Sequence, residues 1–158
     1  MLQLLADEDI GCMIPLVPES WFGGYNWYLS AIRLGRISSR AYSSLFSVSA
    51  SLKSKESSRA SLHSIRRLLE DWRQDIPLEF RPEEPIQLEV DASPSRKLVF
   101  LQTQYNYYNI LIALDRLTIQ VDQGTPSIEE TRHRLMQSAR TIIELTIYID
   151  ARAFVSIG

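Results

Sequence analysis

The sequence predicts an all-α fold, an antiparallel helical bundle of about four helices with a long irregular acidic connector. Apolar residues recur at helical spacing in four stretches, and no two stretches with strand periodicity could pair. Proline, glycine and serine separate these stretches. The chain has 158 residues, 45% hydrophobic and 23% charged, as expected for one globular domain.

Residues 1–24 are predicted to form an extended N-terminal arm that lies on another surface. Proline and paired glycine prevent a continuous helix here. The helical domain is predicted to occupy residues 25–158, so that arm and helices make one domain overall. The arm begins with an acidic run and is then punctuated by proline and glycine: Asp7, Glu8, Asp9, Ile10, Pro15, Pro18, Gly23 and Gly24.

Two helices are predicted in the first half of the domain. The serine-dense region 38–64 separates them, and fraying is expected near 47–58 because serine competes for backbone hydrogen bonds. Pro77 should end the second helix, since the residue before a proline is pushed out of the α region. The first apolar stripe is Tyr25, Tyr28, Leu29, Ile32 and Arg36, continued by Tyr42, Leu45 and Phe46; the second is Leu62, Ile65, Leu68, Leu69 and Trp72.

Residues 75–91 are acidic and rich in proline, and they are predicted to be an extended connector. Ile86, Leu88 and Val90 alternate like a short strand, but a lone strand would have no partner. Ser93 and Pro94 suit the N-cap and first position of a third helix that runs to about residue 121. Its stripe is Leu98, Leu101, Tyr105, Tyr108, Ile112 and Leu117, with apolar neighbours around most of the circumference, which predicts a central helix.

The last helix follows Gly124, which suits the C′ position of the helix before it. Two N-caps are compatible with the sequence, Thr125 before Pro126, or Ser127 in a capping box with Glu130. Arg132, His133 and Arg140 are predicted to face outward. The inward stripe is predicted to be Leu135, Ala139, Ile142, Thr146 and Ile149.

Composition and motifs argue against an enzyme and against a resident cofactor or metal. The single cysteine, Cys12, and two separated histidines give no zinc-ligand pattern. No nucleophile elbow, phosphate loop or dinucleotide fingerprint occurs. The net charge of −2 offers no basic field for nucleic acid, and no apolar run is long enough to span a membrane. The arginines at 33, 36, 40, 59, 66 and 67 are therefore interpreted as the solvated sides of helices.

The aromatic residues of the predicted central helix allow two interpretations. Tyr105, Tyr107 and Tyr108 could line a pocket for a flat apolar ligand, with their hydroxyls as polar contacts. We favour a packed core in which these hydroxyls find backbone partners. Asp115 and Arg116 are adjacent on this helix and so diverge. Arg116 lies near the helix C-terminus, where it favours the helix dipole.

Four segments, in this order along the chain, resemble a known family. Asp7-Glu8-Asp9-Ile10 with Pro15 is similar to an acidic signature, and Leu69 and Trp72 with Pro77 resemble a Leu-x-x-Trp…Leu-Pro segment. Residues 98–117, with Tyr105, Tyr108, Leu111 and Arg116, resemble a central helix, and residues 136–143 resemble the helix after it. By these segments the chain resembles the middle homology (regulatory) region of fungal zinc-cluster transcription factors. One departure is Asp115-Arg116-Leu117, where the family has His-Arg-Pro.

The resemblance implies an all-α region that tunes activation in a nuclear transcription factor without contacting DNA. Zinc is expected only in a six-cysteine cluster outside these residues, and the chain is interpreted as part of a longer factor or a truncated relative. The expected partners are other parts of the full-length chain, transcription co-regulators or a small-molecule effector, with no nucleic acid and no membrane. The twelve residues of the signature segments are expected to act structurally. The alternative is a stand-alone helical module that binds proteins or small ligands.

Overall fold

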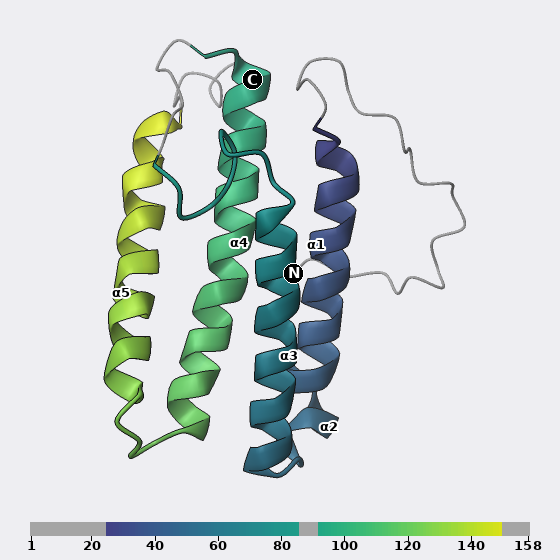
Figure 1. Cartoon of the computed structure of the whole chain (residues 1–158), viewed down its shortest axis with the longest axis vertical. Coiled ribbons are helices and arrows are strands. Elements are labelled where there is room, and N and C mark those ends of the chain that lie inside the picture. Colours follow the sequence, from purple (N-terminus) through teal and green to yellow (C-terminus); the bar gives the residue numbers. More distant parts are fainter. Residues whose placement is uncertain (1–24, 86–91, 150–158) are drawn as a thin grey trace, which may run out of the picture.

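The computed structural model describes residues 25–85 and 92–149, which form helices and turns with no strand among them. The predicted all-α fold is confirmed. Four long helices run alternately up and down (Figure 1). The predicted N-terminal arm, with its acidic signature and Pro15, lies outside the described residues, as do Ile86, Leu88 and Val90. The long helices are α1 (Trp27–Ala41), α3 (Lys55–Gln74), α4 (Pro94–Val121) and α5 (Ile128–Leu145).

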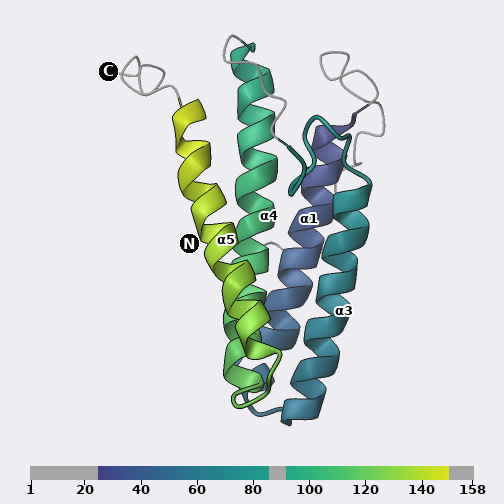
Figure 2. The same ribbon diagram turned by 60° about the vertical axis from the view of Figure 1, so that its left-hand side comes forward.

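Helix α4 is the central element of the bundle. It packs against α5 on one side and against α3 and α1 on the other, while α1 and α3 also pack together. Among the long helices, α5 makes its main contact with α4 alone, and it lies at the edge of the bundle in both views (Figures 1 and 2). Helices α1 and α3 therefore cover one side of α4, and α5 covers the other. Helix α5 itself is covered mainly on the side that faces α4.

Helix α1 begins at Asn26, whose side-chain oxygen accepts a hydrogen bond from the Leu29 amide at 2.9 Å. Its buried stripe is Ser30, Leu34, Ile37 and Ala41. The predicted stripe through Tyr28, Ile32 and Arg36 is therefore wrong in register, and Tyr28 is 47% exposed. Leu34, Ile37 and Ala41 are themselves spaced by three and four, so the sequence held a second apolar stripe, and that second stripe is the buried one.

The serine-rich break between α1 and α3 forms where it was expected. A π-helical turn (Tyr42–Phe46) leads to the short helix α2 (Val48–Ser51). Ser47 caps α2 by accepting a hydrogen bond from the Ala50 amide, and Ser54 caps α3 through the Ser57 amide. Serine thus ends one helix and starts the next by bonding to the backbone. Of the predicted continuation of the first stripe, Leu45 is buried but Tyr42 and Phe46 are exposed.

Helix α3 buries Leu62, Ile65, Leu69 and Trp72 as predicted and ends at Gln74, shortly before Pro77. The connector after it is not extended in its described part, residues 75–85. It turns back onto the bundle and buries Phe80, which is 1% exposed. The Gln104 amide of α4 donates to the Phe80 carbonyl at 3.0 Å. The sequence did not indicate that Phe80 would be buried, because acidic residues and prolines surround it.

Helix α4 begins and ends as predicted, with Ser93 as N-cap and Pro94 in the first turn. Its buried residues lie on several faces, which confirms its central position. Of the predicted stripe, Tyr108 is buried, Leu101, Tyr105, Ile112 and Leu117 are half-buried, and Leu98 is 54% exposed, so the most buried face of α4 lies beside the predicted one. Gly124 has a φ of 89°, the left-handed conformation that glycine adopts without steric cost. It lies two residues beyond the C-cap, Asp122.

Helix α5 corrects the predicted inward stripe. Its buried residues are Thr131, Ser138 and Leu145. Ala139, Thr146 and Ile149 are exposed, because the face toward α4 carries polar side chains that the apolar pattern could not reveal. Ser127 occupies the N-cap position, but its side chain makes no capping hydrogen bond. The capping box is therefore not formed.

Candidate binding groove

No group of three or more histidine, cysteine, aspartate or glutamate side chains lies close enough to hold a metal ion within residues 25–85 and 92–149. None of the helices described is both long and apolar enough to span a membrane. Within the described residues, charged side chains form a buried cluster where α3, α4 and α5 meet.

A buried ion-pair triad joins these three helices. Asp115 of α4 is fully buried. Arg66 of α3 donates to its Oδ1 at 2.5 Å, and Arg134 of α5 donates to both carboxylate oxygens, at 2.6 Å and 3.1 Å. Hydrogen bonding to this carboxylate raises the pKa of Arg134. Arg66 also donates to the Thr118 hydroxyl at 3.0 Å, so that the triad is hydrogen-bonded as buried charges require.

Beside this triad lies a polar groove formed by two adjoining hollows that share Glu83 and Arg134; we call it the Glu83–Arg134 groove. The first hollow has a volume of about 400 Å³ and the second about 230 Å³. Helices α3, α4 and α5 and the connector line it. The lining residues are Glu83, Tyr108, Arg134, Gln137, Ser138, Arg140 and Thr141 in the first hollow, and Arg66, Leu69, Glu70, Tyr107 and Leu111 in the second.

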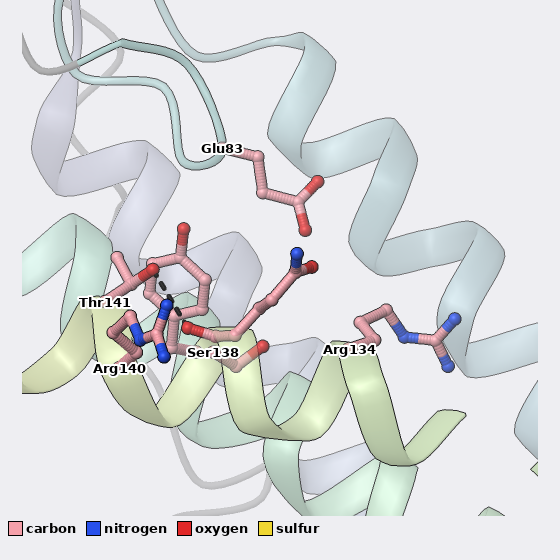
Figure 3. A pocket seen from close by; sticks show the side chains of 7 residues that line it. Glu83, Arg134, Ser138, Arg140 and Thr141 are labelled. Atoms are coloured by element: carbon pink, nitrogen blue, oxygen red, sulfur yellow. Dashed lines mark hydrogen bonds between the residues drawn. The ribbon is translucent and has the colours of Figure 1, made fainter. Parts of the chain in front are cut away.

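Glu83 approaches the groove from the connector. Figure 3 shows its side chain reaching from this loop toward the helix that carries Ser138 and Arg134. Glu83 has a φ of 67°, a left-handed conformation that costs a non-glycine residue about 1–2 kcal/mol. Arg73 holds the loop in place: it donates to the Pro82 carbonyl at 3.0 Å and lies 3.8 Å from the Glu83 carboxylate. The same arginine lowers the pKa of Glu70 by hydrogen bonding to it.

Aromatic side chains form the apolar floor behind the groove. Tyr107 stacks on Trp72 with ring centroids 6.4 Å apart and meets Tyr108 edge-on at 5.2 Å. Burial raises the pKa of both tyrosines, and the nearby negative charge of Glu83 raises them further. Burial also raises the pKa of Tyr25. These rings are packed in the core, as favoured from the sequence, although the Tyr25 hydroxyl is buried without a hydrogen-bond partner among the described residues.

The raised tyrosine pKa values predict a loss of stability at alkaline pH. The folded state keeps these phenols neutral above the unfolded pKa of about 10, where the unfolded chain releases their protons. The contribution of these neutral phenols to the free energy of unfolding is therefore complete below about pH 10, and it falls as the pH rises above 10. In a titration followed by phenolate absorbance and circular dichroism, Tyr107 and Tyr108 should ionise together with the loss of helix. Tyr107→Phe should reduce the amplitude of this step; ionisation of these residues in the intact fold would contradict the prediction.

The structure places the signature residues in three different environments. Leu69, Trp72, Tyr108 and Leu111 are buried together around α4, and three of them also border the groove. Tyr105 is half-buried and donates a long hydrogen bond to the Ile142 carbonyl at 3.4 Å. Pro77 is half-buried just after α3, while Arg116 is exposed and lies away from the Glu83–Arg134 groove. Asp7, Glu8, Asp9, Ile10 and Pro15 are outside the described residues.

Sequence reasoning missed the residues that carry the charge of this site. Arg66 was interpreted as part of a solvated face, but it points toward the buried Asp115. Asp115 itself was treated only as a neighbour of Arg116, and Arg134 and Glu83 were not singled out. One signal was available, because Asp115 continues the apolar row of Leu111 on a central helix. A carboxylate there is almost never buried without a partner.

The fold and the groove together describe an all-α helical bundle with a polar, mixed-charge groove. No family model matches the chain, and no solved structure matches it. The chain is 31% identical over 117 residues to an ABC-transporter-regulating transcription factor of Aspergillus oryzae, a match that covers 73% of this chain and 13% of that protein. It is also 31% identical over 96 residues to a protein of the same description from Aspergillus fumigatus, covering 60% of this chain and 10% of the relative.

The chain is therefore similar to a segment of fungal transcription factors. The chain spans only about an eighth of the length of the first relative and a tenth of the second. Both relatives are described as transcription factors, a class that is generally not enzymatic.

Proposed function

We propose that this chain is the regulatory, non-DNA-contacting region of a fungal zinc-cluster transcription factor and acts in the nucleus. The observation that carries the proposal is the 31% identity over 117 residues to a fungal transcription factor. The signature residues Leu69, Trp72 and Tyr108 support it, because they meet in one core. The same similarity suggests genes for ABC transporters as the targets of the full-length protein.

The architecture suits a region that responds to binding. Helices α1, α3 and α4 pack together, whereas α5 is attached mainly to α4 and through Arg134 to Asp115. An effector or co-regulator in the Glu83–Arg134 groove would contact α5, α4 and the connector at once. Such a ligand would change the position of α5 only if it bound more tightly to one arrangement of α5 on the bundle than to another. Zinc would belong to a six-cysteine cluster elsewhere, since this chain has one cysteine.

A reporter assay tests this function directly. Residues 1–158 are inserted between a heterologous DNA-binding domain and a strong activation domain in a fungal host. We expect several-fold lower reporter output than from the same fusion with an inert linker of equal length. A Trp72→Ala version, with its core disrupted, should lose this restraint at equal protein abundance.

Two results would contradict the proposal. One is equal reporter output with residues 1–158 and with the inert linker. The other is direct binding of purified residues 1–158 to duplex DNA at micromolar concentration and physiological salt, because the proposed region does not contact DNA. A defined small-ligand response without any effect on transcription would instead favour a stand-alone binding module.

A further inference from the structure

A second groove lies at the end of the bundle where α2 joins α3. It has a volume of about 570 Å³ and lies between the π turn with α2 on one side and the C-terminal half of α4 on the other. We call it the end groove. Its apolar surface comes from Leu45, Phe46, Ala50, Ala113, Leu117 and Val121, and its charged lining residues are Lys53, Lys55 and Arg116.

All charged residues that line the end groove are positive, and the carboxylates near it are engaged elsewhere. Asp122 accepts a hydrogen bond from Arg59 at 2.6 Å, and Glu56 lies 3.9 Å from the same arginine. The Lys53 ammonium donates to the Ser44 carbonyl at 3.0 Å. Within the described ranges 25–85 and 92–149, no carboxylate forms an ion pair with Lys53, Lys55 or Arg116. Three like charges facing one groove favour an anionic occupant.

Apolar side chains are also exposed on and next to the π turn and α2, which form one side of the groove. Phe46 is 43% exposed, and Val48 and Leu52 are each 84% exposed. Contiguous exposed apolar surface is uncommon on a monomeric protein and marks an interaction site. An apolar groove rimmed by cations therefore fits a segment that carries both aliphatic side chains and carboxylates.

We propose that residues 1–10 of this chain dock in the end groove. This segment reads Met-Leu-Gln-Leu-Leu-Ala-Asp-Glu-Asp-Ile, with leucine at 2, 4 and 5 and consecutive acids at 7, 8 and 9. The three acids match the three cations Lys53, Lys55 and Arg116 in number and sign. The leucines would cover Phe46 and Leu117, whose apolar surface the groove leaves open.

The chain is long enough for this contact. The fourteen residues between Ile10 and Tyr25, where the described fold begins, can span about 50 Å when extended. The twenty residues from α1 through the π turn rise about 30 Å along the bundle. The acids of the connector compete poorly for the site, because the connector lies at the opposite end of the bundle from α2 (Figure 1). There Glu79 already pairs with Arg96, and Glu83 and Glu84 lie near Arg73.

A paramagnetic label on the full chain tests the docking. Cys12 is the only cysteine, so a nitroxide attached there reports on residues 1–10 without other substitutions. We expect the amide signals of Ala50, Lys53 and Leu117 to lose more than half of their intensity, while those of Met136 and Arg140 on α5 stay nearly unchanged. The broadening should fall as salt rises, since ion pairs at a surface are screened.

Charge reversal identifies the contact. Lys53→Glu with Lys55→Glu and Arg116→Glu should abolish the broadening, and so should Asp7→Lys with Glu8→Lys and Asp9→Lys. The two sets combined should restore it. Arg67→Glu and Arg132→Glu, at exposed positions on α3 and α5, are the matched control and should leave it unchanged.

Three outcomes would overturn the proposal. They are broadening centred elsewhere on the fold, broadening that survives the charge reversals, and broadening that appears only between labelled and unlabelled molecules in a mixed sample. The last would mean that a second copy supplies the segment. None of these outcomes depends on the transcriptional role, because every measurement is made on the purified chain.

Discussion

Trp72→Ala is expected to lower the free energy of unfolding by about 3–5 kcal/mol, enough to unfold much of a marginally stable domain. Trp72 is 5% exposed in the centre of α3. Its indole nitrogen donates to the Ser30 carbonyl of α1 at 2.9 Å, and its ring stacks on Tyr107 of α4. One side chain therefore connects three helices, and its removal leaves a cavity and breaks the hydrogen bond to α1.

Urea unfolding followed by far-ultraviolet circular dichroism measures this effect without relying on tryptophan fluorescence. Trp72→Phe keeps an aromatic ring but loses the hydrogen bond, so it should cost less than the alanine variant. Arg67→Ala, at an exposed position on the same helix, is the control and should change stability by under about 0.5 kcal/mol. An unfolding midpoint for Trp72→Ala equal to that of the natural chain would refute the core assignment.

Arg134→Met is expected to destabilise the fold by about 2–4 kcal/mol, because it leaves the buried Asp115 with one partner in place of two. Arg134 is the side chain that connects the edge helix α5 to α4 through a bidentate pair. The loss should therefore appear first as faster amide hydrogen exchange in α5. Arg132→Met, an exposed substitution two residues away on the same helix, should have little effect.

A triple variant separates the contribution of charge from that of packing. Asp115→Leu combined with Arg66→Met and Arg134→Met replaces the whole triad by apolar side chains. Such replacements are often neutral or stabilising, because they remove the desolvation cost of the ions. We expect the triple variant to recover most of the stability lost in Arg134→Met. If the triple variant is less stable than Arg134→Met, then the triad stabilises the fold by more than the pairing of the buried Asp115 charge.

Helix positions were predictable where local rules act alone. Ser93 and Pro94 marked the start of α4, and the stripe from Leu62 to Trp72 gave the buried face of α3, because capping and helical periodicity depend on neighbours in sequence. In α1 two apolar stripes competed, and the series Leu34, Ile37 and Ala41 is the buried one. The inner face of α5 was not predictable in this way, because Thr131 and Ser138 are buried by contacts with other helices and no apolar pattern in α5 signals this.

The groove was harder to predict than the fold. Glu83 and Arg134, which line it, and Asp115, which lies beside it, come from three separate segments that meet only in the folded bundle. Sequence spacing carries no information about pairs 19 or 49 positions apart. The folded connector was missed for a similar reason, since Phe80 is buried by contacts with α4 and with Tyr25, and its acidic neighbours in the sequence do not indicate them.

The central claim, a regulatory region of a zinc-cluster transcription factor, is tested most directly by the native transcript upstream of the Met1 codon. The proposal predicts an in-frame sequence encoding Cys-x2-Cys-x6-Cys, a matching second half and a basic stretch, since six cysteines are needed for such a cluster. A stop codon in frame directly upstream, with translation starting at Met1, would contradict it. The chain would then be a separate helical module without the DNA-binding half of such a factor.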